Sequence, residues 1–249
     1  MAKAAGLRVG HIESGLRSFD IFHPFPEELT RLATFRLADV MFCPNEWAVS
    51  NVRNYRAEAI NTNGNTLMDA LNIAIDHNRE AMPPVPDYPF GIVSLHRSEN
   101  ILTKKALLRV VATVEKIAVR HRLLFVLHKP TERRLQISGL LDRLRTNPNI
   151  EFRPRYGYFQ FISLLKHAMF VVTDGGSNQE ECAYLGKPTL LLRKATERKE
   201  GLEEHCVLSR YDPAVIDSFI SQNFAIDNAV PRNTFSPSTV IAEYCAKFA

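Results

Sequence analysis

Two adjacent glycines, Gly175 and Gly176, join a predicted strand to a predicted helix. The apolar run 170–172 leads into Thr173 and Asp174, and a polar helix start follows the glycines. A glycine turn at a helix N-terminus presents free backbone N–H groups and the positive end of the helix dipole. That arrangement binds phosphate or diphosphate groups. The pattern is neither G-x-G-x-x-G nor a P-loop, so NAD binding and ATP hydrolysis are disfavoured.

A hydroxyl and two carboxylates follow the glycines. Ser177 and Glu180 fit a capping box, and one interpretation is that they only cap the helix. Capping does not explain the glycine pair, which allows the backbone to approach a ligand closely. Glu181 lies one turn inside the helix, where a carboxylate can accept hydrogen bonds from ribose hydroxyls. The predicted helix spans 177–185, with Gly186 just past its end.

Two arginines, Arg193 and Arg198, lie just past the next predicted strand. Ligands of open α/β sheets bind at the carboxyl edge of the strands. Guanidinium groups there can neutralise a diphosphate with paired N–H donors. The competing interpretation is a solvated surface on which Glu197 and Glu200 balance the arginines, and spacing alone slightly favours that surface.

Two histidines end predicted strands. His96 closes the first strand of the second half of the chain, where a polar residue faces the ligand crevice and can bind a phosphate or a sugar hydroxyl. A loop histidine without a role fits the same position equally well. His128 ends the next strand and is the weaker candidate.

The first eighty residues supply carboxylates. Glu13 ends a predicted strand, and Glu27 falls in the first turn of a helix that Pro26 opens. Acidic residues there ordinarily stabilise the helix dipole, and Glu27 with Arg31 forms an i,i+4 pair, which is the default interpretation. Two carboxylates near a phosphate site can also share acid and base work on a sugar carbon.

These candidates need a scaffold that brings strand ends together, and the hydrophobic pattern predicts one. The proline-rich segment 82–89 is interpreted as a linker between two domains. After it, short apolar runs alternate with amphipathic segments, which is typical of a parallel, helix-covered, doubly wound sheet. The predicted strands are 90–95, 123–127, 150–152, 170–173 and 189–192. The predicted helices are 107–119, with Thr103 as N-cap, 132–144, 159–167, 177–185 and 213–222.

The region before the linker has the same character with fewer elements. Its predicted strands are 9–13 and 40–43, and its predicted helices are 26–37, 46–54 and 66–77. Two clear strands are too few for an independent doubly wound domain. We therefore predict the C-terminal half of a Rossmann-like domain over 1–82, a second Rossmann-like domain over 83–230, and a C-terminal helix over 231–249 that packs back on the first domain.

Composition narrows the classes of partner. The 249 residues are 45% hydrophobic, and 31 Lys and Arg against 27 Asp and Glu leave a net charge of +4. So small and scattered an excess gives no reason to expect nucleic acid or a membrane surface. The four cysteines are far apart, which predicts reduced thiols and no zinc site. No apolar stretch approaches the ~20 residues of a membrane span, and no secretory signal is visible, so a cytoplasmic location is expected.

Seven short motifs resemble, in the same order, those of the bacterial non-hydrolysing UDP-N-acetylglucosamine 2-epimerases. They are HIESGLR (11–17), PFPEELTR (24–31), GNTLMDAL (64–71), LHRSEN (95–100), TDGGSNQEE (173–181), LGKPTLLLR (185–193) and TERKEG (196–201). No single motif is specific, and their common order makes the resemblance strong. It implies an α/β, GT-B-like fold of two Rossmann-like doubly wound domains, the first incomplete here, with UDP held mainly by the C-terminal domain.

The resemblance also implies an activity, the reversible inversion at C2 of UDP-GlcNAc to UDP-ManNAc without a cofactor or metal. The C2 proton leaves as UDP departs from C1, and UDP adds back to the bound glycal with protonation on the other face. The implied roles are proton transfer for Glu13 and Glu27, diphosphate contact for His96, uracil packing for Phe161, the phosphate turn for Gly175, Gly176 and Ser177, ribose binding for Glu181, and phosphate contact for Arg198 and, more weakly, Arg31. Arg193 stays a substrate-binding candidate by position.

Two departures from the family stand out. The family's turn reads Asp-Ser-Gly-Gly, whereas residues 174–177 read Asp-Gly-Gly-Ser, which moves one hydroxyl by two places. The G-T-R-P-E loop and the G-D-T segment that the family carries before HIESGLR do not occur here. We expect about 100 residues of α/β structure to be absent. We also expect a homo-oligomer or partnership with a separate N-terminal half, because the first region would leave a sheet edge and an apolar face uncovered.

Three other functions stay open. One is a UDP-sugar-binding protein without turnover. Another is a GT-B glycosyltransferase, which the HIESGLR and PFPEE pieces count against. The last is a hydrolysing epimerase, which the Gly-Gly turn and residues 179–181 disfavour by resemblance.

Overall fold

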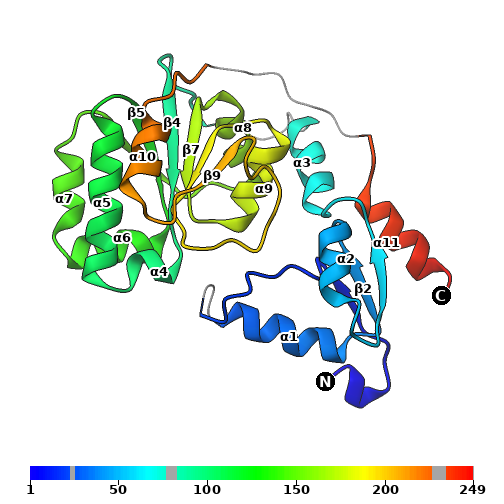
Figure 1. The fold of residues 1–249 in the computed structure, drawn as a ribbon. Helices are drawn as coiled ribbons and strands as arrows, with labels where there is room; N and C mark the ends of the chain where they lie inside the picture. The colour runs from blue at the N-terminus through cyan, green and yellow to red at the C-terminus, as the bar shows by residue number, and fades with distance from the viewer. Residues whose placement is uncertain (23–25, 77–82, 226–233, 249) are drawn as a thin grey trace. The chain divides into compact units, whose positions relative to one another are not determined.

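The computed structural model describes residues 1–22, 26–76, 83–225 and 234–248. They form two compact units (Figure 1), the first made of residues 1–73, 195–199 and 232–249 and the second of 74–194 and 200–231. Parts of the predicted segments lie outside the described residues, namely Pro24, Phe25, His77, Met82, residues 226–233 and Ala249.

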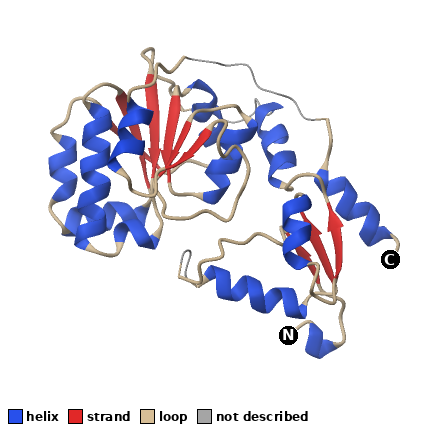
Figure 2. Ribbon diagram, in the orientation of Figure 1, coloured by secondary structure: helices blue, strands red, loops and turns tan. Residues whose placement is uncertain are grey.

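Parallel strands alone form the sheet of the second unit, in the order β6-β5-β4-β7-β8-β9 (Figure 2). The strands are β4 (Phe90–Ser94), β5 (Arg122–Leu127), β6 (Ile150–Pro154), β7 (Phe170–Thr173), β8 (Thr189–Leu191) and β9 (Cys206–Leu208). The chain therefore starts in the middle of the sheet, winds outward through β5 and β6, and returns to the other side of β4 with β7. That reversal between β4 and β7 is the topological switch point of a doubly wound sheet.

Helices cover both faces of this sheet. Figure 1 shows α5, α7 and α10 on one side and α8 and α9 on the other. The helices are α4 (Ser98–Ile101), α5 (Lys104–Ala118), α6 (Lys129–Ile137), α7 (Leu140–Arg145), α8 (Tyr158–His167), α9 (Gly176–Tyr184) and α10 (Pro213–Ile220). Alternate residues such as Val93 and Phe125 pack against Leu107 and Val114 of α5 in one continuous core. The predicted cap of α5 is confirmed, since the Thr103 side chain accepts a hydrogen bond from the Ala106 N–H.

Three details of the second unit differ from the sequence prediction. The single helix predicted over 132–144 is wrong, because Gly139 adopts a left-handed φ of 67° and separates α6 from α7. The short helix α4 and the strand β9 were not predicted. β9 has only three residues, too few to show an alternating pattern.

The first unit is built on a smaller parallel sheet in the order β1-β2-β3. Its elements are a 3-10 turn (Lys3–Ala5), β1 (Gly10–Ile12), α1 (Glu27–Leu37), β2 (Val40–Cys43), α2 (Glu46–Val52), β3 (Glu58–Asn61), α3 (Leu67–Asp76), whose last turn belongs to the second unit, and α11 (Pro237–Ala246). The prediction missed β3 because this edge strand begins and ends in polar residues, Glu58 and Asn61, and is nowhere fully buried.

Both faces of β2 are covered. Met41 and Cys43 face α1 and α2, in a core that includes Phe35 and Val52. Phe42 points the other way, and its ring lies 5.5 Å from that of Tyr244 in α11. The Ser238 N–H of α11 also donates a hydrogen bond to Asp69 of α3, at 2.8 Å.

Candidate functional site

The carboxyl ends of β4 and β7 place two of the predicted regions side by side. Ser94 at the end of β4 pairs in register with Thr173 at the end of β7. His96 follows the first strand, and Asp174 and Gly175 follow the second. Loops that leave neighbouring strands at a switch point diverge and open a crevice between them. The topology thus explains why segments 78 residues apart in the chain meet at one point.

Asp174 fixes the relation between these two loops. Its carboxylate is fully buried and accepts hydrogen bonds from the backbone N–H groups of His96, at 3.0 Å, and of Arg97, at 2.9 Å. The side-chain amide of Asn100 donates a third, at 2.9 Å. The His96 Nδ1 atom lies 3.5 Å from the same carboxylate. A buried carboxylate requires such donors, so the loop that carries His96 is held against the turn that carries Gly175.

Asn100 extends this arrangement. It is fully buried, and its amide also donates to the Leu192 carbonyl, at 2.9 Å. The Tyr211 hydroxyl donates to its Oδ1 atom, at 3.0 Å, and the Arg109 guanidinium lies 3.5 Å from the centroid of the Tyr211 ring. Sequence reasoning named neither Asp174 nor Asn100 as a site residue. The signal for Asp174 was a polar side chain directly after an apolar strand, whereas Asn100, inside α4, gave no such signal. The burial of both side chains was not foreseen.

The glycine turn opens α9 in a different way from the predicted one. Gly175 is the N-cap and Gly176 the first helical residue, so the predicted capping box of Ser177 and Glu180 is wrong. Glu180 is buried and instead accepts a hydrogen bond from the Tyr184 hydroxyl, at 2.8 Å. The end of the helix is confirmed, because Gly186 follows it with a φ of 64°.

At Gly175, crowding by neighbouring side chains favours glycine, whereas the backbone conformation does not. Its φ is −81°, which any residue adopts. A Cβ atom there would lie 2.8 Å from Asn178 Oδ1 and 3.2 Å from His96 Cε1. The first N–H groups of α9 consequently stay open beside the His96 ring, as an anion site requires.

We expect Ser177→Ala to leave the melting temperature unchanged, because Ser177 is exposed and does not cap α9. If the displaced hydroxyl binds a diphosphate, the same change weakens UDP binding about five- to tenfold, the value of one hydrogen bond. Thermal melts and calorimetry on one preparation separate the two effects. A fall in melting temperature would show that the hydroxyl supports the helix after all.

His96 and His128 form a stacked pair, with ring centroids 4.5 Å apart and an interplanar angle of 24°. His128 Nε2 lies 3.2 Å from the Ser94 hydroxyl. Burial, and then the neighbouring His96 and Arg155, lower the pKa of His128 to about 4. His128 is therefore a neutral ring that stacks on one face of His96. This role was not anticipated from the sequence, in which His128 was the weaker candidate for a site residue.

The lowered pKa of His128 predicts a stability loss in mild acid. The folded-state pKa of about 4 lies below the ordinary 6.5, so protonation favours the unfolded chain. This contribution to stability is complete above pH 6.5 and is lost as pH falls from 6.5 towards 4. Denaturation across that range should show a smaller loss for His128→Gln than for the wild type, while His205→Gln, at an exposed histidine, follows the wild type. Parallel profiles for all three proteins would contradict the assignment.

A cavity of about 180 Å³ adjoins these rings. Phe161 and Glu181 both line it, together with His128. Glu181 is 2% exposed and accepts a hydrogen bond from the Asn178 amide, at 3.0 Å. Six further lining residues were not predicted from the sequence, among them Arg155, Tyr156 and Tyr158. Burial, and next the charge of Glu181, raise the pKa of Tyr158 well above its ordinary value, so its hydroxyl stays protonated.

The interpretation of Arg193 and Arg198 as a solvated surface is wrong. Arg193 is completely buried, with its Nε atom 3.6 Å from Glu99 Oε1 in the second unit. Arg198 is 7% exposed and belongs to the first unit, where it pairs with Glu13. Buried guanidinium groups need anionic partners, which is why both lie against glutamates.

Glu13 occupies a strained position just after β1. Its φ of 61° lies in the left-handed region, which is uncommon for a residue with a side chain. Its side chain is 37% exposed and pairs with Arg198. Nearby, His11 Nδ1 lies 3.0 Å from the Ser14 hydroxyl, and burial lowers the pKa of His11.

A second glutamate of the first unit, Glu28, was overlooked. It is fully buried, pairs with Arg17, and accepts a hydrogen bond from the Ser18 N–H at 3.2 Å. Arg31 joins it, with its Nη1 atom 3.7 Å from Glu28 and its Nη2 atom 3.3 Å from the buried Glu197. The sequence signal was the doubled acid of PFPEE, in which only the first was considered.

Glu27, by contrast, is half-exposed and lies 3.8 Å from Arg31. The default interpretation as an i,i+4 surface pair therefore describes its contact correctly. Its exposure leaves the carboxylate accessible to a ligand, whereas that of Glu28 is enclosed.

The described residues contain neither a metal-binding cluster nor a membrane-spanning helix. No group of three or more His, Cys, Asp or Glu side chains in that part of the chain is placed to hold a metal ion. Among the same residues, no helix is both long and apolar enough to cross a bilayer.

Comparison with known proteins identifies the family. The profile of the family described as UDP-N-acetylglucosamine 2-epimerase matches residues 1–230. The UDP-N-acetylglucosamine 2-epimerase of Methanococcus maripaludis is 32% identical over 224 residues, which cover 85% of this chain and 61% of the relative. The UDP-N-acetylglucosamine 2-epimerase of Bacillus subtilis is 34% identical over 209 residues, which cover 79% of this chain and 52% of the relative.

Solved structures agree with this. The Methanocaldococcus jannaschii UDP-GlcNAc 2-epimerase in complex with UDP-GlcNAc and UDP superposes with a TM-score of 0.80 at 26% identity, over 98% of this chain and 71% of that one. The Neisseria meningitidis UDP-GlcNAc 2-epimerase bound to UDP-GlcNAc superposes with a TM-score of 0.82 at 25% identity, over 99% of this chain and 71% of that one.

With its doubly wound second unit and parallel first unit, the protein has the predicted α/β, GT-B-like fold class. The chain belongs to the UDP-N-acetylglucosamine 2-epimerase family. It spans 61% and 52% of the length of the two curated relatives above.

Proposed function

We propose that this chain provides the nucleotide-binding domain and part of the sugar-side domain of a UDP-GlcNAc 2-epimerase that interconverts UDP-GlcNAc and UDP-ManNAc. The observation that carries the proposal is the junction of β4 and β7, where Asp174 holds His96 beside the open N-terminus of α9. Family membership and the complexes of related enzymes with UDP and UDP-GlcNAc support it.

On the nucleotide side, the second unit binds UDP. The diphosphate lies at the N–H groups of Gly176 and Ser177, with His96 at its side. The ribose hydroxyls meet Glu181, and uracil occupies the cavity that Phe161 lines. This cavity, at about 180 Å³, suits the planar base and leaves the sugar outside it.

On the sugar side, the first unit supplies the carboxylates. Glu13 or Glu27 takes the C2 proton as the C1–O bond to UDP breaks, which leaves a C1–C2 double bond and free UDP. The reverse addition re-forms the C1–O bond and places a proton on C2 from the other face. Arg198 pairs with Glu13, and Arg31 lies 3.8 Å from Glu27. Each guanidinium group can fix the orientation of its carboxylate for proton transfer.

Incubation of the chain with UDP-GlcNAc in D₂O tests this function. Exchange at C2 and appearance of UDP-ManNAc, followed by proton NMR, are the expected results. UDP binding is measured separately by calorimetry. Absence of both binding and exchange in folded protein would overturn the proposal.

A second candidate is UDP-sugar binding without turnover. Its signature is heat on UDP addition without C2 exchange.

We further propose that the chain assembles with a second copy of itself. The first unit exposes large apolar side chains, among them Ile12, Phe19 and Phe22, at 47%, 65% and 67%. Light scattering after gel filtration should give a mass above that of a 28.2 kDa monomer when the assembly forms. A cytoplasmic place in cell-surface polysaccharide synthesis fits a nucleotide-sugar enzyme whose four cysteines are unpaired.

A further inference from the structure

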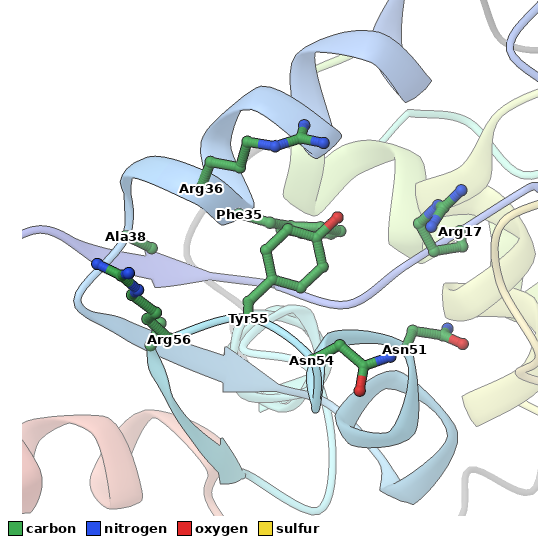
Figure 3. Close-up of a pocket in the computed structure, with 9 residues that line it drawn as sticks. Arg17, Phe35, Arg36, Ala38, Asn51, Asn54, Tyr55 and Arg56 are labelled. Carbon is green, nitrogen blue, oxygen red and sulfur yellow. The ribbon is translucent and has the colours of Figure 1, made fainter.

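A pocket of about 690 Å³ opens on the first unit, and none of the residues assigned above to substrate lines it. Figure 3 shows it between α1, which supplies Arg36, and the turn from α2 to β3, which supplies Tyr55 and Arg56. The Tyr55 ring stands in the middle, with Arg36 and Arg56 on one side and Arg17 on the other. Pockets of this size hold small molecules.

The charge of the pocket has one sign. Its charged lining residues are Arg17, Arg36 and Arg56. A carboxylate occupies only the Nε atom of Arg17, through Glu28. The two terminal amino groups of Arg17 make no hydrogen bond with the described residues, although the guanidinium also stacks over Phe19.

The other two arginines use even fewer of their N–H donors in hydrogen bonds with the described residues. Arg36 donates one hydrogen bond, to the Leu32 carbonyl at 3.3 Å. Arg56 makes no hydrogen bond or ion pair within the described part of the chain. The same holds for the Tyr55 hydroxyl and the Asn54 amide, which also line the pocket. The wall is thus rich in hydrogen-bond donors and carries about three positive charges at neutral pH.

An aromatic floor lies beneath these donors. Phe35 is 1% exposed, and the Tyr55 ring packs edge-on against it with centroids 5.5 Å apart. Ala38 and Ala57 complete the apolar part of the lining. A ligand can therefore place a planar or apolar group on this floor while its anionic group meets the arginines.

We propose that this pocket binds a phosphate monoester or a diphosphate that carries a planar or apolar group. One carboxylate would leave two guanidinium groups unneutralised, whereas a phosphoryl group of charge near −2, or a diphosphate near −3, matches the wall. Guanidinium groups also pair bidentately with phosphate oxygens. The site lies wholly in the first unit and does not depend on UDP binding in the second.

Residue-resolved NMR on the labelled full chain tests this site. Pyrophosphate, phenyl phosphate and citrate are titrated in turn, and the backbone signals of Tyr55 and Arg56 report the pocket while those of Gly175 and Gly176 report the proposed UDP site. Saturable shifts at Tyr55 and Arg56 are expected with pyrophosphate and with phenyl phosphate. Inorganic phosphate is titrated as a fourth ligand, and its dissociation constant is expected to be higher than that of phenyl phosphate, because it has no group to place on the aromatic floor. Shifts confined to Gly175 and Gly176 would overturn the pocket and leave the proposed function standing.

A charge-matched pair of variants completes the test. R36Q/R56Q should weaken phenyl phosphate binding at Tyr55 by about tenfold or more. R53Q/R120Q removes the same charge from exposed arginines outside the pocket and should change it by less than about twofold. Equal losses in the two variants would reduce the effect to general electrostatics and overturn the site. Citrate binding as tightly as pyrophosphate would overturn the phosphate class.

Discussion

Replacing Asp174 with alanine is expected to destabilise the second unit by about 3–5 kcal/mol, because three N–H donors, one buried and two partly buried, lose their acceptor and each costs about 1–3 kcal/mol. The donors are the backbone groups of His96 and Arg97 and the amide of Asn100. The amide keeps its bond to the Leu192 carbonyl, which limits the loss. Urea denaturation of wild type and variant gives the difference.

Asp212→Ala is a matched control for this experiment. Asp212 caps α10 by accepting one hydrogen bond, from the Ala214 N–H, so its loss should cost about 1 kcal/mol. UDP affinity provides the second readout. Asp174→Ala should weaken it about tenfold or more because His96 loses its fixed position, whereas Asp212→Ala should leave it unchanged. Equal stability losses in the two variants would mean that Asp174 is an ordinary loop carboxylate.

Glu13→Gln is expected to lower the rate of C2 proton exchange by about 10²–10⁴, the usual contribution of a general base. The amide keeps the size of the side chain and an oxygen that can accept from Arg198, so the local structure should survive. Affinity for UDP should stay within about twofold, since the proposed diphosphate contacts lie in the second unit. Proton NMR in D₂O measures exchange, and calorimetry measures binding.

Glu203→Gln controls for the unusual backbone of Glu13. Glu203 is an exposed glutamate that also has a positive φ, 69°, and it lies outside the proposed site. We expect it to exchange the C2 proton at the wild-type rate. If Glu13→Gln exchanges the C2 proton at the wild-type rate, the general base is another carboxylate, and Glu27 is the next residue to replace.

Most strands and helices of the second unit could be predicted from the sequence, because buried parallel strands are apolar throughout and differ clearly from amphipathic helices. The prediction failed at β3, because a short strand with polar ends and no fully buried residue shows no apolar pattern in the sequence. It also failed at Gly139, since a glycine inside an apolar periodic pattern is as compatible with one helix as with two.

The candidate site was predictable by residue type and not by environment. The glycine turn and His96 follow apolar strands, so their position at the sheet edge could be inferred. Whether a charged side chain there is solvated or enclosed depends on segments distant in sequence. That is why spacing slightly favoured a solvated surface for Arg193 and why Glu28 was passed over, although both are fully buried. The stacking of His128 on His96 likewise depends on the neighbouring order of β4 and β5.

The central place of β4 has a consequence for synthesis on the ribosome. β4 pairs with β5 on one side and with β7 on the other, and β7 is synthesised much later. The hydrogen bonds from His96 to Asp174 therefore close a loop of 78 residues. Until that stretch has emerged, an apolar strand edge stays open in the nascent chain and is prone to wrong pairing. Production of this protein should therefore be sensitive to translation speed and to chaperone supply in the interval between these two strands.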